Sequence, residues 1–308
     1  MAASGDGPSG TQGPSGTQGP SGTQGESVFR RVLVALDSSA ASDAMLELAA
    51  ALAAANACEL RGLYVEDQDL LHLAELPFAR EVQISQAISR TLKREQLLQD
   101  LRAQAGVARA AMMHQAARHR IAWSFQVAQG RTNEAVLLAA AAGDIIAMAR
   151  RFGPLGQASG FGRRVRLIAE RAPGPLLLAG EPTAGLPGPI LLPYDGSLPA
   201  QRMLPIAVAL ARARNAMLEI VLLGETAERL PETQAELGAR AGRECPRGLR
   251  LWVPRNRGAA LRRLTEADRG LMVLPADAPA WAAGEVEVIL ERARLPIVLQ
   301  AQGPGADA

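Results

Sequence analysis

Residues 31–42 read RVLVALDSSAAS, and residues 188–201 read GPILLPYDGSLPAQ. In each stretch an apolar run ends at an aspartate, Asp37 or Asp195, and small residues then lead into an Ala/Leu-rich segment. This order predicts a buried strand, a tight turn and the first turn of a helix. Because the pattern occurs twice, we interpret the chain as a duplicated domain.

The far ends of the two halves repeat as well. ERAPGPLLLA at 170–179 matches ERARLPIVLQ at 291–300, and GDIIAMA at 143–149 matches RGLMVLPA at 269–276 in pattern. Matching first and last strands, in the same order, indicate that each half folds as one complete unit.

Length and composition fit two domains with separate cores. The chain has 308 residues, of which 48% are hydrophobic, and this is ample for two domains. We expect a first domain at 26–182 and a second, degenerate domain at 183–302, joined through a Pro/Gly-rich linker at 180–188. We expect disordered tails at 1–25 and 303–308.

The N-terminal tail holds three copies of GPSGTQ, which begin at Gly7, Gly13 and Gly19. Almost nothing in this segment can be buried, so its ordering entropy would not be offset, and we predict disorder. Glycine at every third position also satisfies the collagen rule, which stays open as an alternative.

Charge and cysteine content narrow the functional classes. A formal net charge of +2 argues against a nucleic-acid binder with a broad basic face. No apolar run is long enough to predict a membrane span, and no secretory signal is recognisable. Cys58 and Cys245 lack metal-site spacing, so we expect two buried, reduced thiols in a cytoplasmic protein. We identify no metal site.

Strands alternate with helices through both halves, which predicts a parallel sheet covered on both faces. We expect one or two helices over 84–119, with Gly106 as a candidate break, and a kink at Pro205 in the second domain's first helix. The expected strands are 32–36, 59–65, 122–128, 144–148, 175–179, 189–194, 217–223, 249–253, 270–274 and 296–300.

In open parallel α/β sheets, ligands bind beyond the carboxyl ends of the strands. Asp37 ends the first strand, where its carboxylate can accept a hydrogen bond from a ribose hydroxyl, a base amine or a metal-bound water. It can equally cap the following helix, and Asp195 carries the same two interpretations. The loop at 149–166, ARRFGPLGQASGFGRRVR, combines glycines and arginines ahead of a helix. This combination favours an anion, although solvated arginines on a surface loop would look the same.

These stretches together resemble the universal stress protein family in its tandem form. The resemblance covers about 28–300 and rests on VLVALDSS, YVED at 64–67, GDIIAMARR and ERAPGPLLL, with ILLPYDGS and ERARLPIVL in the second half. It implies two tandem five-stranded parallel α/β domains, adenine nucleotide alpha hydrolase-like, with strand order 3-2-1-4-5, forming an internal pseudo-dimer. It also implies a cytoplasmic protein of the stress response.

Some members of that family bind ATP, and they resemble one another in three features. These are a strand-one aspartate, a strand-two valine and G-x-x-G-x9-G-[S/T] after strand four. By this resemblance Asp37 and Val65 match the first two features. Counting back from ERAPGP places the third glycine at Gly162 and Arg163 at the Ser/Thr position. Gly153 and Gly156 have the local G-x-x-G spacing, but only five residues separate Gly156 from Gly162. The motif is degenerate.

The second half departs further from the motif. The segment at 275–288, PADAPAWAAGEVEV, has one glycine and no arginine. The acidic residues Asp277, Glu285, Glu287 and, just beyond the segment, Glu291 would repel a phosphate, so we interpret this half as structural or partner-binding.

Three functions stay open at this point. The first is a regulatory stress protein that binds ATP or a related adenine nucleotide weakly, with magnesium, through the first domain. The second is a protein-interaction module without nucleotide. The third is a nucleotide hydrolase, which the sequence disfavours because half a phosphate loop and no evident base are present. We expect no catalytic residue, an unidentified protein partner, and either a monomer built as an internal pseudo-dimer or a homodimer.

Overall fold

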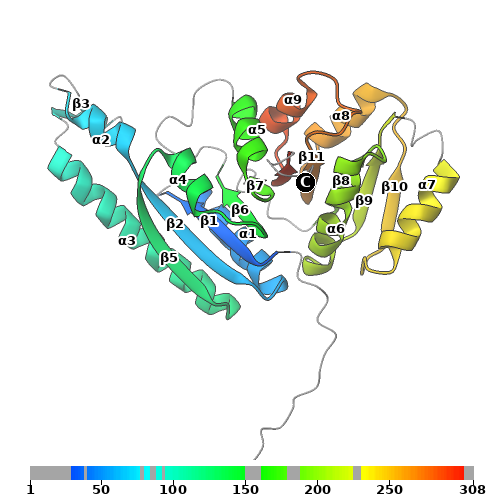
Figure 1. The fold of residues 1–308 in the computed structure, drawn as a ribbon, viewed down its shortest axis with the longest axis horizontal. Helices are drawn as coiled ribbons and strands as arrows, with labels where there is room; N and C mark the ends of the chain where they lie inside the picture. The colour runs from blue at the N-terminus through cyan, green and yellow to red at the C-terminus, as the bar shows by residue number, and fades with distance from the viewer. Residues whose placement is uncertain are drawn as a thin grey trace, which may run out of the picture.

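The computed structural model describes residues 29–37, 40–76, 80–83, 88–91, 94–149, 161–178, 188–224 and 230–301. Within these residues, ten strands form a single sheet and helices cover both of its faces (Figure 1). The tails at 1–25 and 303–308, and most of the linker at 180–188, lie outside the described residues. The disorder and collagen hypotheses for the N-terminal tail therefore concern a segment beyond them.

The first unit contributes five parallel strands in the order β5-β2-β1-β6-β7. In chain order this is 3-2-1-4-5, which confirms the predicted topology. The strands are β1 (Arg31–Leu36), β2 (Glu59–Asp67), β5 (Trp123–Gly130), β6 (Asp144–Met148) and β7 (Leu176–Leu178).

The second unit repeats the same order as β10-β9-β8-β11-β12, again with parallel neighbours. Most strands read as continuous apolar runs because both faces of the sheet are covered. The strands are β8 (Ile190–Tyr194), β9 (Leu218–Leu222), β10 (Leu249–Trp252), β11 (Leu271–Pro275) and β12 (Ile297–Gln300).

Each face of the sheet carries helices from both units. One face is covered by α1 (Ala40–Ala55), α3 (Arg94–His119), α6 (Leu198–Ala213), and α7 (Leu230–Leu237) with the π-helical turn Gly238–Gly242. The other face is covered by α4 (Thr132–Ala139), α5 (Phe161–Arg171), α8 (Arg257–Thr265) and α9 (Glu285–Arg292). Figure 1 shows α5 and α9 beside each other where the two units meet.

The two units join through an antiparallel pair of strands. In β7 and β12, Leu176 pairs with Leu299, Leu177 with Val298, and Leu178 with Ile297. This pairing covers the apolar edge that the fifth strand of each half would otherwise expose. Buried side chains from both units form one continuous apolar cluster on each face of the sheet.

The prediction of helix over the whole of 84–119 is wrong at its start. Residues 80–83 and 88–91 form a small antiparallel sheet of β3 (Arg80–Gln83) and β4 (Ile88–Thr91). The helix α3 begins only at Arg94 and then runs through Gly106 without a break. Gly106 is exposed and has open space around it, so the helix tolerates it as a local cost in backbone entropy.

Three further expectations can be compared with the structure. Pro205 lies inside α6, which continues on both sides of it, and the kink expected there stays a prediction. Both cysteines are free, but only Cys245 is buried; Cys58 is partly exposed, because it lies in the turn that leads into β2. Among the described helices, none is both long enough and apolar enough to cross a membrane.

Candidate functional site

The predicted nucleotide residues Asp37 and Val65 lie next to each other at the carboxyl edge of the first unit. In the parallel register of β1 and β2, Leu36 pairs with Tyr64. Asp37 and Val65 are the residues that directly follow this pair along the chain. Val65 is 8% exposed within β2, and Asp37 is half-buried just after β1. This edge of the first unit therefore carries a half-buried carboxylate and, one strand away, a buried valine.

Asp37 is tied to the helix that follows it. Its backbone N–H donates to the Ser42 hydroxyl in α1 at 3.0 Å, and Ser42 is itself buried. Burial, together with the negative charges of Asp37 and Glu66, raises the pKa of Tyr64 to about 12. The Tyr64 hydroxyl donates to Gln104 Oε1 at 3.0 Å. Tyr64 therefore stays protonated at physiological pH.

The predicted phosphate-binding residues are only partly covered by the structure. Gly153 and Gly156 lie outside the described residues, while Gly162 and Arg163 fall in the first turn of α5. That helix follows β6, which pairs with β1 in parallel, so α5 begins at the same carboxyl edge as Asp37. The start of α5 and Asp37 thus lie at one edge of the sheet, and the nucleotide site itself stays a prediction.

A polar network at the end of β2 was not expected from the sequence. Asp67 accepts hydrogen bonds from the Thr132 hydroxyl at 3.0 Å and from the Asp69 backbone N–H at 2.9 Å. Glu66 accepts one from the Gln129 side-chain amide at 2.7 Å. The YVED sequence signals these two carboxylates, but their partners on β5 and α4 become neighbours only through the fold.

In the second unit, the corresponding aspartate is used for internal bonds. Asp195 Oδ1 accepts from the Ser197 backbone N–H at 3.0 Å and from the Ser197 hydroxyl at 2.5 Å. Its Oδ2 accepts from the Ala280 backbone N–H at 3.1 Å. This last bond ties the segment after β11 to the end of β8. A ribose could bond to that oxygen only in competition with a backbone amide.

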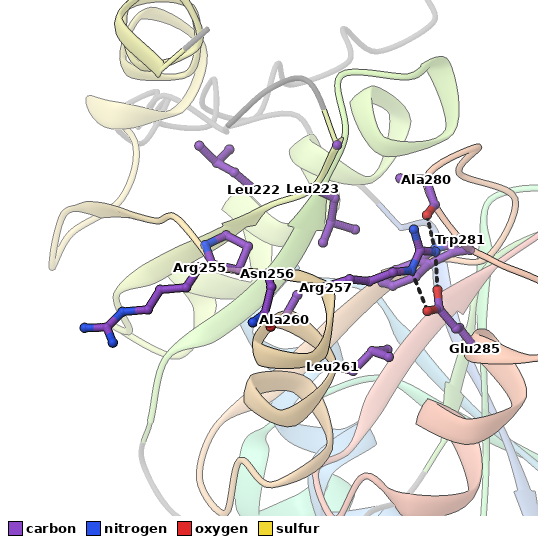
Figure 2. Close-up of a pocket in the computed structure, with 12 residues that line it drawn as sticks. Leu222, Leu223, Arg255, Asn256, Arg257, Ala260, Leu261, Ala280, Trp281 and Glu285 are labelled. Carbon is purple, nitrogen blue, oxygen red and sulfur yellow. Dashed lines mark hydrogen bonds and ion pairs between the residues drawn. The ribbon is translucent and has the colours of Figure 1, made fainter. Parts of the chain in front are cut away.

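A pocket of about 380 Å³ lies at the carboxyl ends of the second unit's strands (Figure 2). It is lined in part by Ala280, whose backbone N–H bonds to Asp195. Three segments form it: the end of β9, the turn between β10 and α8, and the segment between β11 and α9. Its lining residues are Leu222, Leu223, Gly224, Pro254, Arg255, Asn256, Arg257, Ala260, Leu261, Ala280, Trp281 and Glu285.

The polar side of the pocket is organised around Arg257 and Glu285. Arg257 Nε donates to Glu285 Oε1 at 2.6 Å, and its Nη2 contacts Glu285 Oε2 and donates to the Ala280 carbonyl at 2.6 Å. The hydrogen bond to Arg257 lowers the pKa of Glu285. Trp281 is fixed by a 2.7 Å bond from its indole N–H to the Pro275 carbonyl. Figure 2 shows Arg257 and Glu285 turned toward each other.

Arg255 differs from Arg257 because it has no ion pair with any described residue. Its side chain is exposed and turns away from the Arg257–Glu285 pair (Figure 2). With Glu285 neutralising Arg257, the pocket has one excess positive charge. These two arginines were not predicted, because they follow the third strand of the second unit, whereas the predicted phosphate-binding segment follows the fourth strand. Among the described residues, no group of acidic, histidine or cysteine side chains could hold a metal ion.

The fold and the edge geometry define a class: two tandem five-stranded parallel α/β units joined through their fifth strands. Residues 29–178 match the sequence model of the universal stress protein family, so the first unit belongs to that family. Among curated proteins the sequence has no significant match.

Solved structures show the same fold over both units. A universal stress protein from Archaeoglobus fulgidus is similar with a TM-score of 0.65 at 14% identity, covering 89% of this chain and 99% of that chain. A functionally unknown protein from Pseudomonas aeruginosa is similar with a TM-score of 0.54 at 16% identity, covering 90% of this chain and 93% of that chain. At such identities the likeness concerns the fold alone.

Proposed function

We propose that this protein is a regulatory universal stress-type protein that binds an adenine nucleotide weakly through its first unit. The observation that supports this most is the β1–β2 register, in which Asp37 and Val65 are the residues that follow the last pair, Leu36 and Tyr64, at the carboxyl edge. A half-buried carboxylate can accept hydrogen bonds from ribose hydroxyls, and an apolar wall suits a purine face. The start of α5, with Gly162 and Arg163, is at the same edge, where a helix N-terminus favours phosphate.

In this proposal the protein works by binding and not by turnover. Magnesium would accompany the nucleotide through its phosphates, as is usual for this cation. The two units act as an internal pseudo-dimer in the cytoplasm, and the second unit supports the first or receives a protein partner. Assigning the nucleotide to the first unit agrees with the bonds of Asp195 in the second unit. Its carboxylate accepts hydrogen bonds from Ser197 and from the Ala280 backbone N–H.

Native mass spectrometry of the protein mixed with millimolar ATP and magnesium tests the proposal. We expect a mass increment of one adenine nucleotide per chain, and loss of that increment in Asp37→Ala. An Arg171→Ala variant is the matched control, since Arg171 is an exposed residue at the far end of α5. An increment that survives in Asp37→Ala would contradict the assignment of the site.

A second candidate function is supported by the pocket of the second unit. This pocket has a volume of about 380 Å³, walls of leucine and tryptophan, and one excess positive charge. These features suit a small monoanion with an apolar body. Arg255 lies at the rim and would turn its exposed guanidinium inward to meet the acid, while the Arg257–Glu285 pair holds one wall in place. We propose that this pocket binds such an aromatic or aliphatic acid.

The probe for this site is 1-anilinonaphthalene-8-sulfonate, an aromatic monoanion whose emission reports apolar contact. We expect Arg255→Ala to weaken binding about 5–10-fold, as the loss of one charge-assisted contact implies. The control is Arg250→Ala, because Arg250 is an exposed arginine of β10 outside the pocket lining. Equal binding by the wild type and Arg255→Ala would reject the pocket as the site.

A further inference from the structure

The two units meet about a pseudo-two-fold axis that passes between Leu177 and Val298. The gap-free match of ERAPGPLLL with ERARLPIVL makes these two residues equivalent in the two units. They are also paired with each other in the sheet, and the flanking pairs Leu176–Leu299 and Leu178–Ile297 are arranged symmetrically around them. In such an isologous contact, a residue near the axis faces its own equivalent.

The helices α5 and α9 follow the same symmetry. They pack against each other, and the same match makes Val165 equivalent to Val286 and Ile168 equivalent to Ile289. All four side chains are buried: Val165 is 2% exposed, Val286 1%, Ile168 5% and Ile289 0%. The apolar faces of the two helices have therefore kept one pattern.

The last turns of the two helices share Glu170–Arg171 and Glu291–Arg292, but a charged position nearer the middle has reversed its sign. The same match places Arg166 opposite Glu287, and Arg166 Nη1 lies 3.3 Å from Glu287 Oε1 across the axis. Arg166 Nη2 also lies 3.8 Å from Asp277, which follows β11 of the second unit. Glu287 Oε2 is buried and has no hydrogen-bond partner among the described residues, so the charge of this carboxylate is balanced chiefly by Arg166.

We propose that this reversal of charge makes the α5–α9 surface specific for the other unit of the chain and closes it to a second copy of the same unit. Two first units in the same geometry would bring Arg166 against Arg166. Two second units would bring Glu287 against Glu287, with Asp277 nearby. Like charges facing each other in a partly buried contact suppress wrong partners.

The burial of these groups supports an effect on pairing. The exposed fractions of the side chains are 34% for Arg166, 27% for Glu287 and 21% for Asp277, so solvent screens them only in part. Leu177 and Val298 supply apolar contact that either unit could offer to its own copy. The charges on α5 and α9 decide which of the possible partners is accepted.

The test uses two complementary full-length variants, tagged Arg166→Glu and untagged Glu287→Arg. Within each variant the axis pair becomes Glu–Glu or Arg–Arg, whereas exchange between the two chains restores both Arg–Glu pairs. We expect co-expression to give a 1:1 heterodimer on capture of the tag, and each variant alone to melt several degrees below the wild type. A tagged and an untagged wild type should stay separate.

Glu291→Arg is the matched control, because Glu291 is an exposed residue one turn further along α9 and has no ion pair with a described residue. Its co-expression with tagged Arg166→Glu should give no capture. The double variant Arg166→Glu/Glu287→Arg should be monomeric and recover at least half of the lost melting temperature. Equal capture in every combination, or single variants that melt with the wild type, would overturn the proposal.

Discussion

Leu177 of β7 and Val298 of β12 lie opposite each other in an antiparallel pair, and both side chains are 0% exposed. Each of these strands would otherwise be the open edge of a five-stranded sheet, with unpaired N–H and C=O groups. Pairing them removes both edges at once and joins the apolar cores of the two units. The contact is therefore as much a part of the fold as the pairing within each unit.

Val298→Pro tests how much this contact stabilises the protein. β12 lies between β7 and β11, so the Val298 backbone has a strand on either side. Proline cannot donate a hydrogen bond and clashes locally, and we expect a loss of about 3 kcal/mol in the free energy of unfolding. Urea denaturation measures it. Val298→Ala, which keeps the N–H and loses only packing, should cost about 2 kcal/mol or less.

Asp144→Ala should be strongly destabilising. Its carboxylate, 3% exposed, accepts from Arg31 Nε at 3.0 Å and Nη2 at 2.5 Å and from the Ala141 backbone N–H at 2.8 Å. Removing it leaves the largely buried guanidinium of Arg31 unpaired, at a cost of about 3–5 kcal/mol.

The control for Asp144 is Glu47→Ala. Glu47 forms an exposed pair with Arg118, with side chains 60% and 59% exposed, so its loss should cost under about 1 kcal/mol. Chemical denaturation of both variants gives the comparison. Similar losses in the two variants would show that the Arg31–Asp144 pair is no more than a surface contact.

Gly270 and Gly106 should respond to alanine in opposite directions. Gly270 has φ +107, and a Cβ there would lie 2.0 Å from the Pro189 carbonyl oxygen. Gly270→Ala should therefore cost at least about 1–3 kcal/mol. Gly106 lies in α3, and a Cβ there would meet no described atom within 4 Å. Gly106→Ala should therefore raise the free energy of unfolding by about 0.5–1 kcal/mol. Thermal unfolding of the two variants distinguishes these signs.

Cys58 should react slowly with alkylating reagents. Burial raises the pKa of its thiol to about 11 from an ordinary value of 9.0. At pH 8 the thiolate fraction is then about 100-fold smaller than in an ordinary thiol, and only the thiolate reacts. In a Cys245→Ser background, iodoacetamide should label the folded protein about 100-fold more slowly than the urea-unfolded chain. Equal rates would contradict the raised pKa.

The same shift affects stability at high pH. The folded pKa of Cys58 lies above the unfolded value, so its contribution to stability is complete below about pH 9 and is lost as the pH rises toward 11. Cys58→Ala should make the free energy of unfolding less dependent on pH in that range. A pH dependence as steep as that of the wild type would argue against this coupling.

The fold was predictable because its signals are local. Strands such as β6 are short apolar runs with clear boundaries, and the predicted Asp144–Met148 agrees with the structure residue for residue. The β3–β4 pair was not predictable, because its four-residue strands carry polar residues and lack a strong period. At Gly106 the local signal was misleading. Glycine is unfavourable in a helix, but the residues on both sides of Gly106 keep α3 helical there.

The candidate sites were predictable only where the sequence motif and the strand end coincide. Asp37 and Val65 come from two such ends. The arginines of the second unit's pocket were missed because Arg257 meets Glu285 only after α8 and α9 pack together. The acidic segment after β11 was expected to repel a ligand. In the structure two of its carboxylates, Asp277 and Glu287, face Arg166 of the first unit.

Nucleotide binding by the first unit alone is the central claim of this account. Titration calorimetry with ATP and magnesium, at up to millimolar concentration, measures both the affinity and the number of sites on the full-length protein. We predict one site per chain, lost in Asp37→Ala and weakened by about 1.5–3 kcal/mol in Arg163→Ala. Asp195→Asn, which can keep one acceptor for Ala280 but loses the acceptor for the Ser197 backbone N–H, changes only the second unit and should bind nucleotide as the wild type does. No heat from the wild-type protein, or binding that Asp195→Asn and not Asp37→Ala removes, would contradict the claim.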